Sequence, residues 1–153
     1  MSTKNIFKTE WDFSDMYSGI NDPKIEKEIK KIEKLFADFA KKYEDKKFVN
    51  NAKALKQALD DRNKLELEGS LLNGWYLELQ KTLDSSNTEL KAISQKIIDR
   101  YVGAAKKIIF FNIAIAKIPE AKQKMYLKDK NLATYAYYLK LMFDEGKYML
   151  SES

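Results

Sequence analysis

Apolar side chains recur at helical spacing from Ile25 to Tyr43, near the start of the chain. Successive members of this stripe lie four, three, four, three and four residues apart, which places them on one face of a helix. Asp22 can cap the first turn, and Pro23 suits the first helical position because a backbone N–H has no partner there. The pattern predicts a helix over 22–43. Its stripe consists of Ile25, Ile29, Ile32, Phe36, Phe39 and Tyr43.

A second apolar pattern, rich in leucine, runs over 50–82 and predicts the next main helix. Gly69 and Gly74 interrupt it within the stretch EGSLLNGWY, where a helix can kink or let a neighbouring helix approach closely. The functional alternative for this stretch is a hinge, and a kink that serves packing is the interpretation we favour. The apolar positions are Leu55, Leu59, Leu65, Leu67, Leu71, Leu72, Trp75, Tyr76 and Leu79.

The third main helix is predicted over 87–117. Ser86 and Glu89 have the S-x-x-E spacing of a capping box, in which each side chain bonds the backbone N–H of the other residue. Apolar residues surround the helix axis over 108–115, which indicates a central position, and Pro119 either ends this helix or opens the next turn. The inner face consists of Leu90, Ile93, Ile97, Tyr101, Ala104, Ile108 and Phe111.

Two further helices complete the pattern. A short one is predicted near 120–127, and the last main helix covers 131–144, with Gly146 after its end. The stripe of this last helix consists of Leu132, Tyr135, Leu139 and Met142. An apolar residue before a serine, as in Leu150 and Ser151, is typical of the start of another helix, so the sequence predicts a fragment of a longer chain.

The predicted fold class is all-α. The sequence has no strand-like alternation of useful length and no repeat at a fixed period, and its 153 residues include only five glycines and two prolines. We expect a single domain over 1–153, a bundle of about four long helices plus short ones, with antiparallel neighbours and no sheet. The aromatic segment 1–20 is predicted to hold the N-terminus against this domain through Trp11, Phe13, Met16 and Tyr17.

Composition removes several kinds of chemistry. The chain has no histidine and no cysteine, so it cannot form a Ser-His-Asp triad, a histidine-ligated metal site or a disulfide framework. The N-terminal residues lack the apolar core of a secretory signal, and the longest apolar run, over 108–118, is too short to span a bilayer. We therefore expect a soluble, cytoplasmic chain that does not act at a membrane and that catalyses nothing by itself.

The formal charge of +5 and the pI near 9.1 suggest the hypothesis that the chain binds nucleic acid. However, the basic residues are almost all lysines interleaved with acids, as in PKIEKEIKKIEK, where Glu26 and Lys30 form a favourable i,i+4 pair. Such mixtures usually mark a solvated helix face. Nucleic acid binding is therefore the least favoured hypothesis.

Some residues remain as candidates for chemistry, and none is assigned a catalytic, cofactor-binding or metal-binding role. Asp12 with Asp15 and Asp60 with Asp61 could serve as paired carboxylates, but we interpret the first pair as turn or cap residues and the second as solvated helix surface. Aromatic residues in two places could stack on peptide or bases, and at helical spacing core or interface packing is favoured. Among them Tyr137 is expected to be exposed. These aromatic residues are Trp75, Tyr76, Tyr135, Tyr137, Tyr138 and Phe143.

The chain also resembles a known family along nearly its whole length. The stretch WDFSDMYSGINDPKIEKEIKKIEKLFADFAKKY is similar to the start of the oligoendopeptidase F family of zinc oligopeptidases, which opens with a W-D-L-x-x-L-Y-like segment, a D-P pair and a charged helix. LDSSNTELKAISQKI is similar to that family's D-T-S-D-x-E linker, and KKIIFFNIAIAKIPE continues the match. NLATYAYYLKLMFDEGKYMLSES resembles its L-x-x-Y-x-x-Y-L run followed by an L-S-E helix start.

The resemblance implies an N-terminal, non-catalytic helical domain of a cytoplasmic zinc-dependent oligopeptidase, one that walls a cleft for short peptides. The family's H-E-x-x-H helix is missing from this chain, so zinc is expected only in the longer parent and no ligand is transferred to any residue here. The expected partners are the missing catalytic domain and oligopeptide substrate. The 75–76 region, the 108–115 helix or the Tyr137 face would meet that domain, which also predicts self-association of the isolated chain. The alternative is a stand-alone helical adaptor without enzymatic activity.

Overall fold

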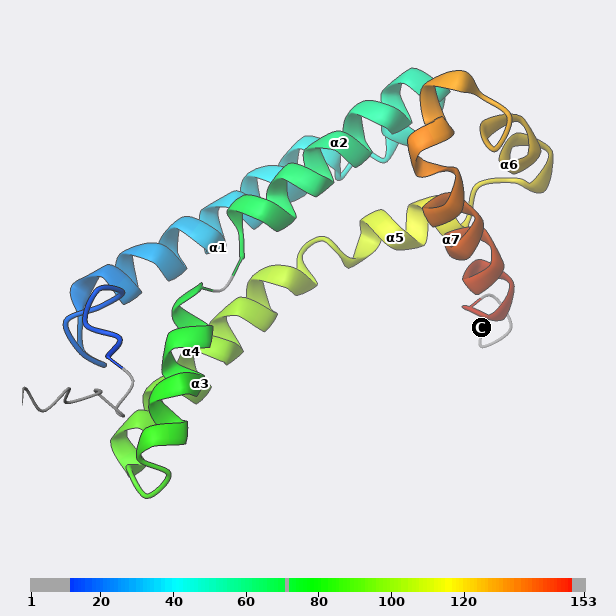
Figure 1. Cartoon of the computed structure of the whole chain (residues 1–153). Helices are drawn as coiled ribbons and strands as arrows, with labels where there is room; N and C mark the ends of the chain where they lie inside the picture. The colour runs from blue at the N-terminus through cyan, green and yellow to red at the C-terminus, as the bar shows by residue number, and fades with distance from the viewer. Residues whose placement is uncertain (1–11, 71, 150–153) are drawn as a thin grey trace, which may run out of the picture.

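A computed structural model describes residues 12–70 and 72–149 (Figure 1). Over these residues the fold is all-α, as predicted, and contains no strand. The elements in chain order are α1 (Pro23–Tyr43), η1 (Lys47–Val49), α2 (Ala52–Glu68), α3 (Leu72–Leu83), α4 (Thr88–Lys106), α5 (Ile109–Ala116), α6 (Glu120–Tyr126), η2 (Lys130–Tyr135) and α7 (Ala136–Met149). The N-terminal residues 1–11, with Trp11, and the proposed helix start at Leu150 lie outside the described residues.

The first helix forms as its sequence predicts. The Asp22 side chain accepts a hydrogen bond from the backbone N–H of Lys24 at 2.8 Å, and Pro23 occupies the first helical position. All six residues of the predicted stripe are buried. Before the helix, Tyr17 is buried with its ring 4.7 Å from that of Tyr76, and its hydroxyl donates to Glu28. The described part of the aromatic segment therefore packs on the domain as expected.

The helix predicted over 50–82 is two helices, which corrects the prediction of a single kinked one. α2 ends at Glu68, and Gly69 donates its N–H to the carbonyl of Leu65 at 2.7 Å. A β-carbon at Gly69 would lie 2.7 Å from that carbonyl, which a larger residue could not tolerate without a backbone shift, and 3.1 Å from the ring of Phe36, a tight contact with α1. α3 then begins at Leu72 in a new direction (Figure 1).

The helix predicted over 87–117 also divides, into α4 and α5, at Lys107 and Ile108. Its cap differs from the predicted Ser86–Glu89 box: the Asn87 side chain accepts from the N–H of Leu90 at 2.9 Å and caps α4. The Ser86 hydroxyl instead donates to Asp84 at 2.7 Å, within the preceding turn. Serine and asparagine cap helices about equally well. Because Ser86 is already bound to Asp84 in the preceding turn, Asn87 caps the helix instead.

The last part of the chain departs from the predicted helix over 131–144. η2 takes the first part of this range, and α7 continues to Met149. Gly146 is therefore inside α7 and buried, not after its end. A β-carbon at Gly146 would lie 2.7 Å from the carbonyl oxygen of Ala116, so α7 crosses α5 at very short range. The short helix predicted near 120–127 is confirmed as α6.

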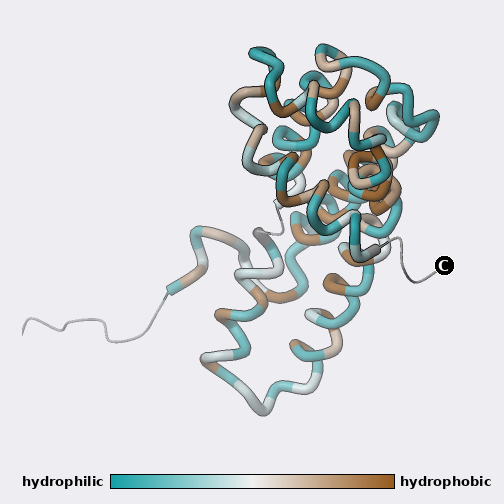
Figure 2. Tube along the Cα trace, turned by 90° about the vertical axis from the view of Figure 1, so that its right-hand side faces the viewer, coloured by the Kyte–Doolittle hydropathy of each residue, from teal (hydrophilic) through white to brown (hydrophobic). Residues whose placement is uncertain are grey.

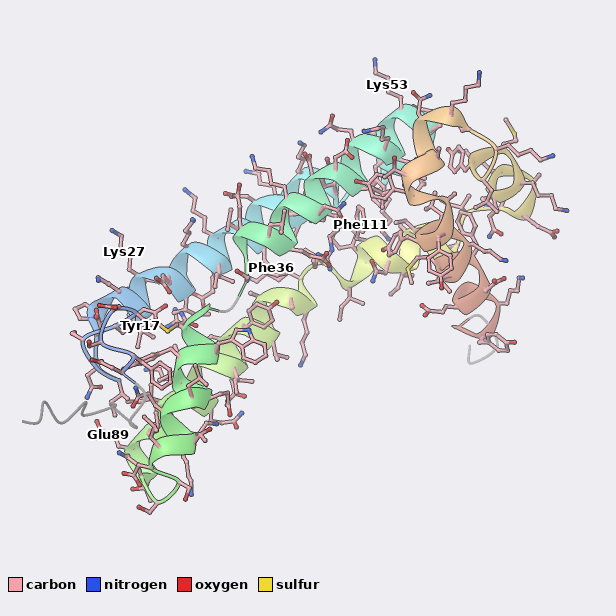
Figure 3. The ribbon with its side chains drawn as sticks, viewed as in Figure 1. Tyr17, Lys27, Phe36, Lys53, Glu89 and Phe111 are labelled. Carbon is pink, nitrogen blue, oxygen red and sulfur yellow. The ribbon has the colours of Figure 1, made fainter. Side chains whose placement is uncertain are left out.

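The helices form an elongated arrangement in which α2 returns antiparallel beside α1, and α3 and α4 form a second antiparallel pair (Figure 1). Hydrophobic and hydrophilic positions alternate along the trace at helical intervals (Figure 2). Phe36 and Phe111 point inward between helices, whereas Lys27 and Lys53 point away from them (Figure 3). Phe111 is fully buried, with its ring stacked 4.6 Å from that of Phe48 and 5.2 Å from that of Phe39.

An arginine joins α1 to α4. Arg100 donates from Nε and Nη2 to the two carboxylate oxygens of Glu33, at 2.8 and 2.7 Å, and from Nη1 to Glu26 at 2.6 Å. Hydrogen bonds from this guanidinium hold the pKa of both glutamates below the usual value. We name this contact the α1–α4 joint: Arg100 with Glu26 and Glu33.

Candidate docking pocket

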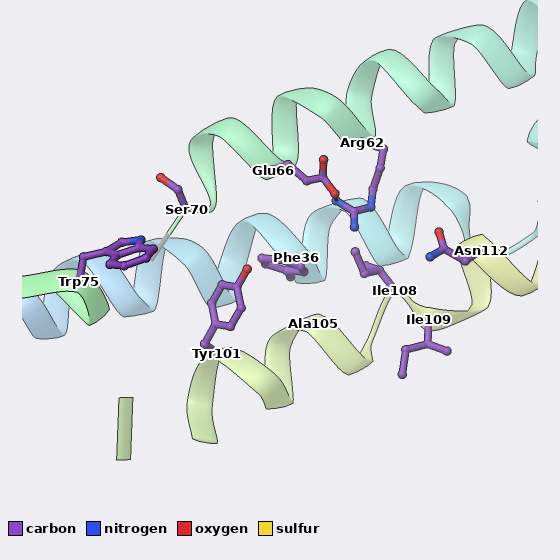
Figure 4. Close-up of a pocket in the computed structure, with 10 residues that line it drawn as sticks. All are labelled: Phe36, Arg62, Glu66, Ser70, Trp75, Tyr101, Ala105, Ile108, Ile109 and Asn112. Atoms are coloured by element: carbon purple, nitrogen blue, oxygen red, sulfur yellow. Dashed lines mark ion pairs between the residues drawn. The ribbon is translucent and has the colours of Figure 1, made fainter. Parts of the chain in front are cut away.

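A pocket of about 560 Å³ opens between α2 on one side and α4 with α5 on the other, and we name it the α2–α5 pocket (Figure 4). Two helix breaks frame it, because α2 ends beside Ser70 and α4 gives way to α5 at Ile108. Ligand sites are commonly concave and mostly apolar, with a few polar groups that fix orientation. The lining residues are Phe36, Arg62, Glu66, Ser70, Trp75, Tyr101, Ala105, Ile108, Ile109 and Asn112.

Aromatic rings form the apolar wall of the pocket. Phe36 comes from α1 and is buried, and Tyr101 comes from α4 and is half-buried. Their ring centroids lie 5.8 Å apart at an interplanar angle of 79°, the edge-on contact that aromatic quadrupoles favour. Ile108 adds a buried aliphatic side chain beside them. The wall is therefore held by the core of the domain.

The polar groups of the pocket come mainly from α2. Arg62 Nη1 lies 2.6 Å from Glu66 Oε1, four residues further along the helix. Within the described residues this buried Nη1 makes no hydrogen bond of good geometry, so the contact is an ion pair alone. The Arg62 side chain is 21% exposed and that of Glu66 is 59% exposed. Figure 4 shows the guanidinium of Arg62 pointing from α2 toward Ile108, across the pocket.

One end of the pocket is tied to α7. The Tyr138 hydroxyl donates to Asn112 Oδ1 at 3.4 Å, which joins α7 to α5. Burial raises the pKa of Tyr138, the charge of Arg62 opposes that rise, and the charge of Glu66 adds to it. The Tyr138 hydroxyl therefore links α7 to the pocket at Asn112.

The pocket rim carries large apolar side chains in contact with solvent. Trp75 is 71% exposed, and Ile109 is 54% exposed. A second hollow of about 280 Å³, lined by Gly74, Trp75, Glu78 and Ile98, adjoins the same tryptophan. Trp75 therefore lies between two hollows, a position in which an aromatic side chain can anchor a partner.

The predicted acidic candidates lie elsewhere. Asp12 accepts a hydrogen bond from the N–H of Ser14 at 3.0 Å, which fits the interpretation of the Asp12–Asp15 pair as turn residues. Asp60 and Asp61 correct the prediction of a solvated helix surface, because both are half-buried and bind other elements. These two carboxylates are structural connections from α2 to its neighbours.

Each of the two carboxylates binds a tyrosine hydroxyl and a lysine. Asp60 accepts from Tyr135 of η2 at 2.7 Å and from Lys56 at 2.6 Å, and these bonds hold its pKa low. Asp61 accepts from Tyr43 and Lys42 of α1, and these bonds lower its pKa although burial opposes them. Burial and the bond to Asp60 raise the pKa of Tyr135 to about 12.

The aromatic candidates divide between core and surface. Tyr76 and Phe143 are buried, and Tyr135 and Tyr138 are half-buried with the bonds described above. Tyr137 is 76% exposed, as predicted, and it does not line the α2–α5 pocket. The central position predicted for 108–115 holds for only one side of α5, because Ile109 and Ile113 are exposed. Sequence reasoning named Trp75 and 108–115 as contact regions but missed Arg62, Glu66 and Tyr101.

In the described ranges, 12–70 and 72–149, no group of three or more His, Cys, Asp or Glu side chains could hold a metal ion. Among the described helices, none has both the length and the apolar character needed to cross a membrane. No family model matches the chain, and neither does any curated protein or solved structure.

Proposed function

We propose that this chain is a non-catalytic helical docking module, and that a second polypeptide packs on the α2–α5 pocket and its Trp75 rim. The observation that carries the proposal is the pocket itself, in which a rigid aromatic wall adjoins exposed Trp75 and Ile109. Exposed apolar side chains grouped around a concavity are typical of protein interaction sites. The side chains of this pocket are suited to binding a partner.

The sequence resemblance names the first candidate for that second polypeptide. In this proposal it is the catalytic part of a zinc oligopeptidase of the oligoendopeptidase F type, which supplies the H-E-x-x-H helix and the zinc. This chain then helps to wall the cleft that admits oligopeptides, in the cytoplasm. The alternative is an adaptor that works alone and uses the same pocket for an unrelated protein.

The first experiment is to sequence the source gene beyond codon 153. If the reading frame continues into H-E-x-x-H, the downstream part and this chain are produced separately and mixed with zinc and an internally quenched fluorescent oligopeptide. We expect the mixture to hydrolyse the peptide faster than the downstream part alone. Trp75→Ala should weaken this gain.

The matched control is Tyr137→Ala, because Tyr137 is a similarly exposed aromatic residue that does not line the pocket. Equal loss in both variants, or none in either, would count against the pocket as the docking surface. A stop codon directly after Ser153 would exclude the proposal that this chain is part of a zinc oligopeptidase, and the stand-alone adaptor would then be the proposed function. That alternative is then tested by affinity capture with the wild type and the same two variants.

A further inference from the structure

We propose that the α2–α5 pocket recognises an acidic residue flanked by apolar ones in the partner polypeptide, and that the partner's carboxylate replaces Glu66 as the ion-pair partner of Arg62. The inference rests on the proposed docking function and adds the chemistry of the bound segment. It follows from the unequal burial of the two charged groups in the pocket.

The cation of the pair is fixed, whereas the anion is replaceable. Arg62 is 21% exposed and its Nη1 is buried, so the guanidinium cannot turn to solvent without leaving the pocket. Glu66 is 59% exposed and can rotate into water at little cost. A buried cation without an anion is unfavourable, so the pocket selects a ligand that brings a negative charge.

A basic partner would have the opposite effect. It would draw Glu66 away and leave Arg62 half-enclosed without a counter-charge. The guanidinium carries five N–H donors in a planar fork, and here Glu66 contacts it at Nη1 without a hydrogen bond of good geometry. An incoming carboxylate that meets two of these donors in parallel gains directional hydrogen bonds that the present pair lacks.

The walls around Arg62 determine what must accompany the carboxylate. Phe36, Tyr101 and Ile108 line the same pocket as the guanidinium, with the Phe36 and Tyr101 rings in contact, and exposed Trp75 lies at the rim. A segment that places a carboxylate in the pocket therefore also places its neighbouring side chains on aromatic and aliphatic groups. The pocket fits an acidic residue between large apolar residues, and not an acidic run.

The fluorescence of Trp75 can be used to measure binding in the pocket. The chain has two tryptophans, so Trp11→Phe leaves Trp75 as the only one, and its fluorescence reports occupancy of the pocket. The probes are three peptides, acetyl-Leu-Phe-Glu-Leu-amide and the same peptide with Gln or Lys in place of Glu. Each is titrated into the Trp11→Phe chain, and circular dichroism verifies that every variant keeps its helices.

We expect the Glu peptide to bind about tenfold more tightly than the Gln peptide, the effect of one charge-assisted hydrogen-bonded pair, and the Lys peptide to bind most weakly. Arg62→Gln should abolish the preference for Glu. Glu66→Gln should tighten binding of the Glu peptide about two- to fivefold, because it removes the internal competitor. Added NaCl should reduce the preference.

Equal binding of the three peptides to a folded chain would overturn the inference, as would weaker binding of the Glu peptide to Glu66→Gln. The Glu66→Gln result decides the question even if Arg62→Gln fails to fold. The proposed function has a separate readout: if Trp75→Ala weakens docking of the second polypeptide while the peptides show no charge preference, only the present inference fails. If docking ignores Trp75, the proposed function fails.

Discussion

The two arginines of the chain lie in two regions that differ in where their ion-pair partners come from. In the α1–α4 joint, Arg100 binds Glu33 through two nitrogens and Glu26 through a third, so its partners belong to another helix. In the α2–α5 pocket, Arg62 pairs with Glu66 of its own helix, at Nη1, and with no other acidic side chain among residues 12–70 and 72–149. Both side chains are about equally buried, at 22% and 21% exposed.

The difference teaches what each charge contributes. The partners of Arg100 belong to α1, and Glu33, which binds it through both oxygens, is only 34% exposed, so this contact stabilises the arrangement of the two helices. Replacing the partner of Arg62 requires only a rotation of the Glu66 side chain. An arginine satisfied across two elements is a structural contact, and one satisfied within its own helix beside a pocket is available to a ligand.

The largest effect is expected where the two regions meet. Phe36 is buried and packs on Tyr101 at the pocket wall, one helical turn beyond Glu33 of the joint. Phe36→Ala should lower the free energy of unfolding by about 3 kcal/mol, at the low end for Phe→Ala because the new cavity opens into the pocket. Urea denaturation measures it, with Phe36→Leu as the milder control. A loss below about 1 kcal/mol would show that Phe36 does not join the regions.

Next comes the joint itself. Arg100→Met keeps an unbranched apolar stem but removes three charged hydrogen bonds to α1. We expect a loss of about 1–2 kcal/mol in the free energy of unfolding, after allowance for the solvent that reaches these side chains. Chemical denaturation at pH 7 provides the value. An unchanged midpoint would place the joint among the surface ion pairs that contribute nothing measurable.

Acid should erase the difference between this variant and the wild type. Arg100 lowers the pKa of Glu26 and Glu33 in the folded state, so their contribution is present above the unfolded value of about 4.5 and is lost as pH falls through the lower folded values. The gap in urea midpoint between wild type and Arg100→Met should therefore narrow below pH 4.5. A gap that stays constant down to pH 3 would contradict the assignment.

The smallest effects on stability belong to the pocket. Arg62→Gln should change the free energy of unfolding by about 0.5 kcal/mol or less, because it removes one ion pair within a helix. Trp75→Ala should have a similarly small effect, because its side chain is mostly exposed. Thermal melts of both variants measure this. A loss above about 2 kcal/mol in either would mean that the pocket, like the joint, is a structural region.

Much of the fold follows from periodicity. The stripe of α1 and the cap at Asp22 were predicted because local spacing and backbone chemistry decide them. The break at Ile108 was not, because neither glycine nor proline stands at Lys107 or Ile108, where α4 ends, and the break depends on how α5 packs against α7. The pattern could not separate the exposed side of α5 from the buried one, since both carry isoleucine.

The pocket was predicted only in part, for a related reason. Exposure of Tyr137 followed from its place off the stripe, but Arg62 and Glu66 look like an ordinary i,i+4 surface pair until α4 and α5 are placed beside them. Likewise, Asp60 and Asp61 were predicted to be solvated helix surface, because the tyrosines that bind them lie on other elements. Side chains that act across elements carry no local signature.

The crossing of α5 and α7 limits which substitutions this sequence can accept during evolution. A methyl group at position 146 would meet the backbone carbonyl oxygen of Ala116 at 2.7 Å, and every residue type at position 116 carries that same oxygen. No change at position 116 can therefore compensate for a larger residue at 146. We expect position 146 to stay glycine in descendants that keep this crossing, without a covarying partner, although alanine is the better helix former.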